Sequence, residues 1–156
     1  MAISASSTRR AARETALRVL YMVEVGKTPL QEALIETIAA NELDETGSAY
    51  VHNLVNSTLA GQKALDILLK QHAKGFPPER QQVVDRAILR LSLAELTDES
   101  SETPAGVVAN EAVELAKKYS TPEAAKFING VLGAVIRERE THETSEASET
   151  SENPQV

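Results

Sequence analysis

The chain contains no cysteine and no tryptophan, and its only aromatic residues are two Phe and three Tyr among 156 residues. Without cysteine there can be no disulfide and no thiolate chemistry, which fits a reducing compartment. No apolar run approaches the roughly 20 residues that a membrane-spanning helix needs. The arginines near the start are not followed by the apolar segment of a secretion signal. We therefore expect a cytoplasmic protein with no membrane partner.

Sequence motifs for catalysis and metal binding are also missing. The seven glycines form neither a GxGxxG nor a GxxxxGK[ST] loop, and no serine lies in a GxSxG turn. The three histidines, His52, His72 and His142, are far apart, and Glu-x-x-His does not occur. We expect no catalytic residue, no metal site and no cofactor, and hence a protein that is not an enzyme.

Charge is unevenly distributed along the chain, whose formal net charge is −7. Residues 1–20 hold four Arg and one Glu, a net +3, whereas residues 141–156 hold four Glu and no Lys or Arg, a net −4. An acidic body argues against non-specific coating of duplex DNA. A local basic surface remains compatible with it, because salt screens charges beyond about 8–10 Å.

Three arginines cluster near the start of the first predicted helix. Ser7 or Thr8 is a suitable N-cap, and Arg9, Arg10 and Arg13 follow within two turns. A helix N-terminus favours acidic residues, so intrinsic helix stability does not account for these cations. Guanidinium groups beside free backbone N–H groups suit a chain of phosphates. The alternative is a solvated basic turn that pairs with the acidic body.

The apolar spacing predicts an all-α fold of six or seven helices in two packed halves. The halves cover about 8–75 and 79–140 and are separated by Gly75-Phe76-Pro77-Pro78, a firm helix stop. A flexible arm is expected over residues 1–7 and a disordered acidic tail over 141–156. The predicted helices cover about 8–25, 29–40, 48–72 with a bend at Gly61, 83–96 as the central buried helix, 105–119 and 121–140.

The segment AKFINGVLGAVIRE, residues 125–138, combines helical apolar spacing with residues that disfavour a helix. Gly130 and Gly133 each cost about 1 kcal/mol inside a helix, which indicates close approach by a neighbouring helix or by a ligand. Phe127 has two interpretations, as a plain core residue or as a ring on which an unpaired base stacks.

Three segments together resemble the NusB family of transcription antitermination factors. They are RRAARETALRVLY, VVDRAILRLSLAEL and VVANEAVELAKKYSTPEAAKFINGVLGAVIRE, in the family's order, within about residues 8–138. The resemblance implies a bacterial, non-enzymatic protein with a NusB-like helical domain. It also implies binding of single-stranded boxA RNA in nascent ribosomal RNA transcripts, together with the ribosomal protein NusE. Other Nus factors and RNA polymerase are the further implied partners.

By this resemblance, the residues that contact RNA in the family correspond here to Arg9, Arg10, Arg13, Phe127 and Asn129. The surface that faces NusE is expected near Tyr21 and Asp85. The family often has a longer arginine run, which Ala11 and Ala12 interrupt here. A helical adaptor that binds only protein partners is the alternative function. Self-association into a homodimer is a further expectation that the sequence leaves open.

Overall fold

Seven α-helices and one short 3-10 helix make up the ordered elements of the computed structural model, which describes residues 5–151. The all-α prediction is confirmed for this part of the chain, and none of its helices is long and apolar enough to cross a bilayer. The helices are α1 (Ala5–Glu24), α2 (Leu30–Ala40), α3 (Glu45–Ala60), α4 (Gln62–His72), η1 (Pro78–Arg80), α5 (Val83–Thr97), α6 (Ala105–Tyr119) and α7 (Pro122–Ser151).

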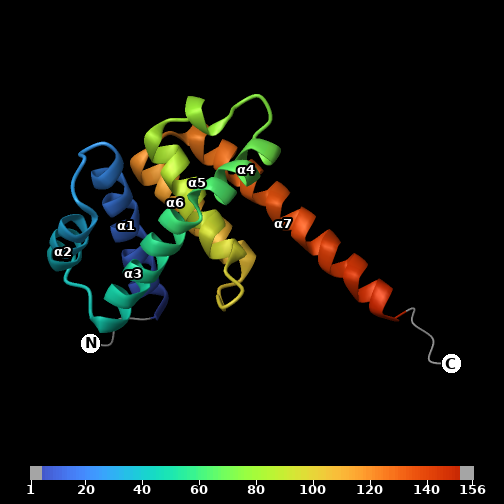
Figure 1. The fold of residues 1–156 in the computed structure, drawn as a ribbon, viewed down its shortest axis with the longest axis horizontal. Coiled ribbons are helices and arrows are strands. Elements are labelled where there is room, and N and C mark those ends of the chain that lie inside the picture. The colour runs from blue at the N-terminus through green and yellow to red at the C-terminus, as the bar shows by residue number, and fades with distance from the viewer. Residues whose placement is uncertain (1–4, 152–156) are drawn as a thin grey trace.

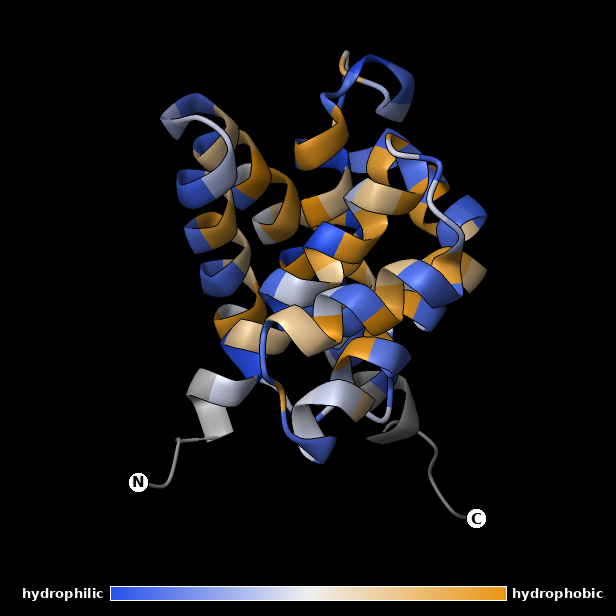
Figure 2. Cartoon of the chain, turned by 90° about the vertical axis from the view of Figure 1, so that its left-hand side faces the viewer, coloured by the Kyte–Doolittle hydropathy of each residue, from blue (hydrophilic) through white to orange (hydrophobic). Residues whose placement is uncertain are grey.

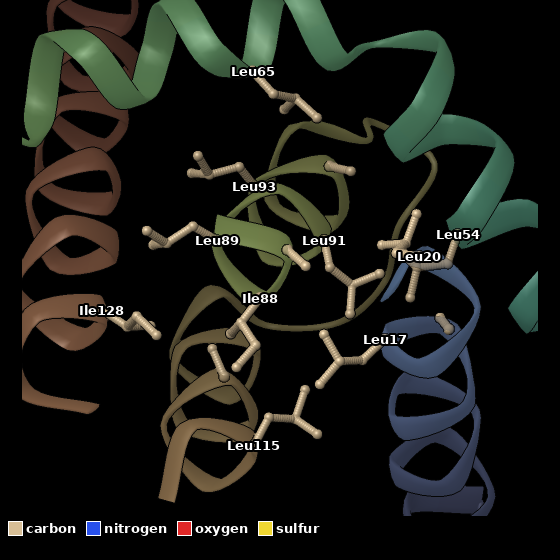
Figure 3. Close-up of a cluster of buried hydrophobic side chains, with 14 of the residues drawn as sticks. Leu17, Leu20, Leu54, Leu65, Ile88, Leu89, Leu91, Leu93, Leu115 and Ile128 are labelled. Atoms are coloured by element: carbon tan, nitrogen blue, oxygen red, sulfur yellow. The ribbon is translucent and has the colours of Figure 1, made fainter. Parts of the chain in front are cut away.

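Helix α5 lies at the centre of the fold, as its nearly continuous apolar sequence predicts. It packs against α1, α3, α4, α6 and α7, and Figure 3 shows its leucines pointing toward side chains from these neighbours. Ile88, Leu89 and Leu93 are completely buried. Burial of each such side chain stabilises the fold by about 1.5–3 kcal/mol. The neighbouring helices contribute Leu17 and Leu20 of α1, Leu54 of α3, Leu65 of α4, Leu115 of α6 and Ile128 of α7.

The predicted helix over 48–72 is divided at Gly61. Helix α3 ends at Ala60 and α4 starts at Gln62, while the Gly61 amide still donates to the Ser57 carbonyl at 3.0 Å. Both helices bury apolar side chains, among them Leu54 and Val55 of α3 and Leu65 and Leu69 of α4. Hydrophilic and hydrophobic residues alternate along the helices of the fold, as expected for amphipathic helices (Figure 2). The buried residues of both sequence halves form one continuous cluster.

Helix α7 differs most from its prediction. The sequence predicts a disordered tail from residue 141, but the helix continues to Ser151 and projects away from the body (Figure 1). No Gly or Pro occurs between Gly133 and Pro154 to end it. The Thr141 and Thr144 hydroxyls donate to the carbonyls of Arg137 and Glu140. Residues 141–146 are exposed, as expected for a solvated segment.

The two chain ends are only partly described. Helix α1 begins at Ala5, inside the arm predicted over residues 1–7, and residues 1–4 lie outside the described part. The same holds for residues 152–156 of the predicted tail.

The exposed end of α7 is predicted to contribute little to stability. A chain ending at Glu140 should change the free energy of unfolding by no more than about 0.5 kcal/mol, because the side chains of residues 141–146 are exposed. Leu132→Ala, which removes a completely buried side chain of the same helix, should cost about 2–5 kcal/mol. Urea unfolding measures both, and a large loss on truncation would contradict the prediction.

Candidate nucleic-acid interface

The clustered arginines do not lie at the beginning of their helix. Because α1 begins at Ala5, Arg9 and Arg10 belong to its second turn and Arg13 to its third. The helix dipole acts mainly on the first turn, which is also where the free N–H groups are. The expected joint action of these arginines and the helix N-terminus is therefore corrected: only the side chains themselves can bind an anion here.

Arg13 is buried and fully engaged within the protein. Only 5% of the residue is exposed, and its Nε and Nη2 atoms donate to the Glu95 carboxylate at 2.9 and 2.6 Å. Nη2 also donates to the Tyr50 hydroxyl at 3.2 Å, and that hydroxyl in turn donates to Glu95. Burial alone would lower the pKa of the Arg13 guanidinium, but its bonds to Glu95 raise the pKa overall. The expectation that Arg13 contacts phosphate is thus corrected, since this guanidinium is not presented to a ligand.

Arg9 and Arg10 remain on the surface, on either side of Arg13. The Arg10 side chain is 60% exposed and makes two bonds to Glu111 of α6, at 3.0 and 2.8 Å. These bonds lower the pKa of the Glu111 carboxyl. The Arg9 guanidinium lies 6.0 Å from the centre of the Tyr50 ring, at a polar cleft of about 270 Å³. Two of the three predicted arginines are therefore accessible to an anion.

Long polar side chains bridge α1 and α6 and continue this surface. Glu14 of α1 accepts hydrogen bonds from the Lys118 ammonium, at 2.7 Å, and from the Tyr119 hydroxyl. Arg18 also donates to the Tyr119 hydroxyl, at 3.1 Å. We call this set the α1–α6 seam; its members are Arg10, Glu14, Arg18, Glu111, Lys118 and Tyr119. These long side chains link α1 to α6 across the space between the two helices.

Exposed lysines of α6 and α7 were not among the residues that the sequence predicted for this surface. Lys117 and Lys118 lie at the C-terminal end of α6, and Lys126 lies on the second turn of α7. The Lys-Lys pair is visible in the sequence, but its proximity to α1 depends on the pairing of Lys118 with Glu14. Lys118 is thus placed beside α1, and Lys117 and Lys126 are further exposed cations of α6 and α7.

The other candidate RNA contacts lie on the first turns of α7. Phe127 is half-buried against the core, and its ring meets Phe76 edge-on, with the ring centres 5.5 Å apart. Asn129 and Gly130 are exposed, and a methyl group added at Gly130 would meet no atom within 4 Å. The prediction of a closely approaching helix is wrong at Gly130, and the surface beside Asn129 is open.

The predicted RNA contacts therefore form two groups. Arg10 is bonded to the middle of α6 through Glu111, whereas Phe127 and Asn129 follow the C-terminal end of α6. The part of α6 between Glu111 and Tyr119 spans about 12 Å at 1.5 Å per residue. An extended ligand is needed to reach both groups.

An apolar groove marks the candidate partner surface. It has a volume of about 420 Å³ and lies between α1 and α2, with Tyr21 43% exposed on its wall. Val84 of α5 and Tyr119 of α6 complete the groove. Asp85, the second predicted partner residue, is only 9% exposed and accepts a hydrogen bond from the Ser120 hydroxyl at 2.6 Å. Tyr21 is thus accessible, whereas the Asp85 carboxylate is held within the protein.

The described residues, 5–151, contain no candidate site for a metal ion. Within this range, no group of three or more His, Asp or Glu side chains is arranged to hold a metal ion. The surface chemistry is that of cations, aromatic rings and an apolar groove.

Comparison with known proteins gives a consistent result. The model of the NusB family matches residues 10–137. The transcription antitermination protein NusB of Acetivibrio thermocellus is 37% identical over 129 residues, covering 83% of this chain and 88% of that protein. The NusB protein of Pseudoalteromonas atlantica is 35% identical, covering 89% of this chain and 98% of its own length.

Solved structures agree with the sequence comparison. A crystal structure of the antitermination factors NusB and NusE in complex with dsRNA has a TM-score of 0.75 and 31% identity, covering 83% of this chain and 96% of that chain. The solution structure of NusB from Aquifex aeolicus has a TM-score of 0.69 and 30% identity, covering 96% of this chain and 95% of that one.

The buried Arg13–Glu95 pair predicts a clear difference between neighbouring arginines. Arg13→Ala should destabilise the protein by about 3–5 kcal/mol, because it leaves the Glu95 carboxylate buried without its partner. Arg9→Ala should change stability by no more than about 0.5 kcal/mol. Urea unfolding distinguishes them, and equal effects would contradict the assignment. In the double variant Arg13→Met, Glu95→Leu, most of the lost stability should return, since neither charge remains buried.

Proposed function

Since the chain belongs to the NusB family, whose members are transcription antitermination factors and not enzymes, we propose that it binds boxA RNA together with NusE. The RNA is the single-stranded boxA element of nascent ribosomal RNA transcripts. The resulting complex joins other Nus factors on RNA polymerase and supports transcription of ribosomal RNA operons. The relative solved with NusE and dsRNA supports an RNA and a NusE partner for this chain.

The observation that carries this proposal is the exposure of Arg9 and Arg10 on an otherwise acidic protein. Both guanidinium groups lie at the surface of α1, and Lys117 and Lys126 are exposed cations on α6 and α7. An extended RNA strand running from α1 to α7 would meet the arginines at one end and Phe127 and Asn129 at the other. Base stacking on an aromatic ring adds about 1–3 kcal/mol per base.

The apolar groove is the proposed NusE contact. Tyr21 supplies a large, partly exposed ring of the kind that anchors protein interfaces. The acidic remainder of the chain is complementary to a basic ribosomal protein, and such complementarity favours encounter with the correct partner. Asp85 contributes to this surface by positioning the chain at Ser120 rather than by direct contact.

A binding titration with and without NusE tests the proposal. Labelled boxA RNA, a scrambled strand and a duplex are titrated with the protein alone and then at saturating NusE. We expect NusE to raise boxA affinity about 5- to 150-fold, the usual range of coupling between two sites. The Tyr21→Ala variant should need more NusE to reach the same effect. Equal boxA affinity with and without NusE, or no preference for boxA over the scrambled strand, would favour the protein-only adaptor.

The arginine surface predicts a change in the salt dependence of RNA binding. Each lost phosphate contact on a single strand should reduce the log–log slope of affinity against salt by about 0.7. Arg9→Ala should show this loss most simply, because Arg10→Ala also releases the Glu111 carboxylate from its ion pair. Lys63→Ala removes an exposed cation from α4 and serves as the control. A slope in Arg9→Ala that matches the control would remove Arg9 from the RNA surface.

A further inference from the structure

We propose that Phe76 provides the ring on which an RNA base stacks, with Phe127 supporting it from the core side. This inference rests on the proposed function. The only two phenylalanines of the chain meet here, although one lies in the loop before α5 and the other on α7. Their ring centres are 5.5 Å apart and their planes are at 81°, an edge-to-face pair.

Exposure identifies Phe76 as the outer ring of the pair. Phe76 is 41% exposed, whereas Phe127 is half-buried and packs against the core. A base approaching from solvent reaches the more exposed ring first. Phe127 then acts as a support that fixes the tilt of Phe76, and its own contact with RNA is smaller than the sequence alone predicts.

The loop that carries Phe76 is rigidly held. Gly75 has a φ of +78°, a conformation that L side chains rarely adopt, and the Phe76 amide donates to the Ala73 carbonyl at 3.0 Å. The Gln81 side chain, only 4% exposed, donates to the Phe76 carbonyl at 3.0 Å. Arg86 donates to the Pro78 carbonyl at 2.9 Å.

The rigidity of this loop reduces the conformational entropy that is lost when a ligand binds to Phe76. Prolines at 77 and 78 remove further backbone freedom after the ring. An aromatic side chain on such a loop loses little conformational entropy when a base binds, so more of the stacking free energy appears as affinity. A large apolar ring held rigidly toward solvent is therefore arranged for contact rather than for packing.

The surrounding charges favour a base over a phosphate at this position. Lys74, Arg80 and Lys126 are exposed near the ring pair in sequence, but so are Glu79 and Glu123. This mixed charge gives little net attraction for a bare phosphate. Base stacking depends mainly on the π-face of the ring and tolerates such surroundings.

The test uses boxA RNA in which single purines are replaced by 2-aminopurine, whose fluorescence is quenched on stacking. It is titrated with the full-length protein at saturating NusE. Phe76→Leu should weaken RNA binding about ten-fold and restore fluorescence at one RNA position. Phe76→Tyr, which keeps the ring, should bind and quench like the wild type. Ile67→Ala shortens another exposed apolar side chain, 60% exposed on α4, and should change neither signal.

The outcomes separate this inference from the proposed function. Wild-type protein that fails to bind boxA RNA at saturating NusE overturns the proposed function itself. Wild-type binding together with unchanged affinity and quenching in Phe76→Leu overturns only the role of Phe76. A Phe76→Leu variant that loses NusE affinity but binds RNA normally would make Phe76 a protein contact, and this too overturns the inference. Urea unfolding confirms that each variant is folded at the assay temperature.

Discussion

The buried ion pair between Arg13 and Glu95 sets how the first helix faces the rest of the molecule. It removes both charges from water, which is tolerated only because the two bonds to Glu95 and the Tyr50 hydroxyl satisfy the guanidinium. The three residues belong to α1, α5 and α3, so the pair joins the first helix to the centre of the fold. With α1 locked in this rotation, each other side chain on it has a defined direction.

The directions of Arg9 and Arg10 follow from this rotation. At about 100° per residue, Arg9 and Arg10 lie about 40° to one side and 60° to the other side of Arg13 around the helix. Arg9 consequently reaches toward Tyr50 on α3, whereas Arg10 reaches toward Glu111 on α6. The buried Arg13 thus determines where Arg9 and Arg10 point, so the candidate RNA surface depends on a residue that is itself 5% exposed.

Tyr119 links the candidate RNA surface to the candidate partner groove. Its hydroxyl belongs to the α1–α6 seam, where it donates to Glu14 and accepts from Arg18, and the residue also lines the apolar groove beside Tyr21. A partner seated in the groove would lie against side chains that position the seam. Such a direct path of contacts is a physical route by which partner and RNA binding can influence each other.

The sequence by itself determined the local structure, because helix spacing and helix stops act over a few residues. The central position of α5, the end of α4 at His72 shortly before Gly75-Phe76-Pro77-Pro78, and the break at Gly61 all follow from apolar periodicity and from glycine and proline chemistry. The same reasoning predicted an end of α7 near residue 140, because the acidic segment that follows lacks apolar residues, whereas the helix continues to Ser151. A helix that is already formed can extend beyond its buried part where no Gly or Pro ends it, because adding a residue to an existing helix avoids the cost of nucleation.

Only the tertiary structure decided which arginine is buried and which aromatic ring is exposed. Arg9, Arg10 and Arg13 have the same chemistry and nearly the same local surroundings, and Arg13 is distinguished by Glu95, 82 positions along the chain. The pairing of Phe76 with Phe127, which makes Phe76 the exposed ring of the pair, likewise joins a loop to helix α7 and cannot be read from local spacing. Burial and pairing between distant segments depend on how the helices pack, and local spacing carries no information about those contacts.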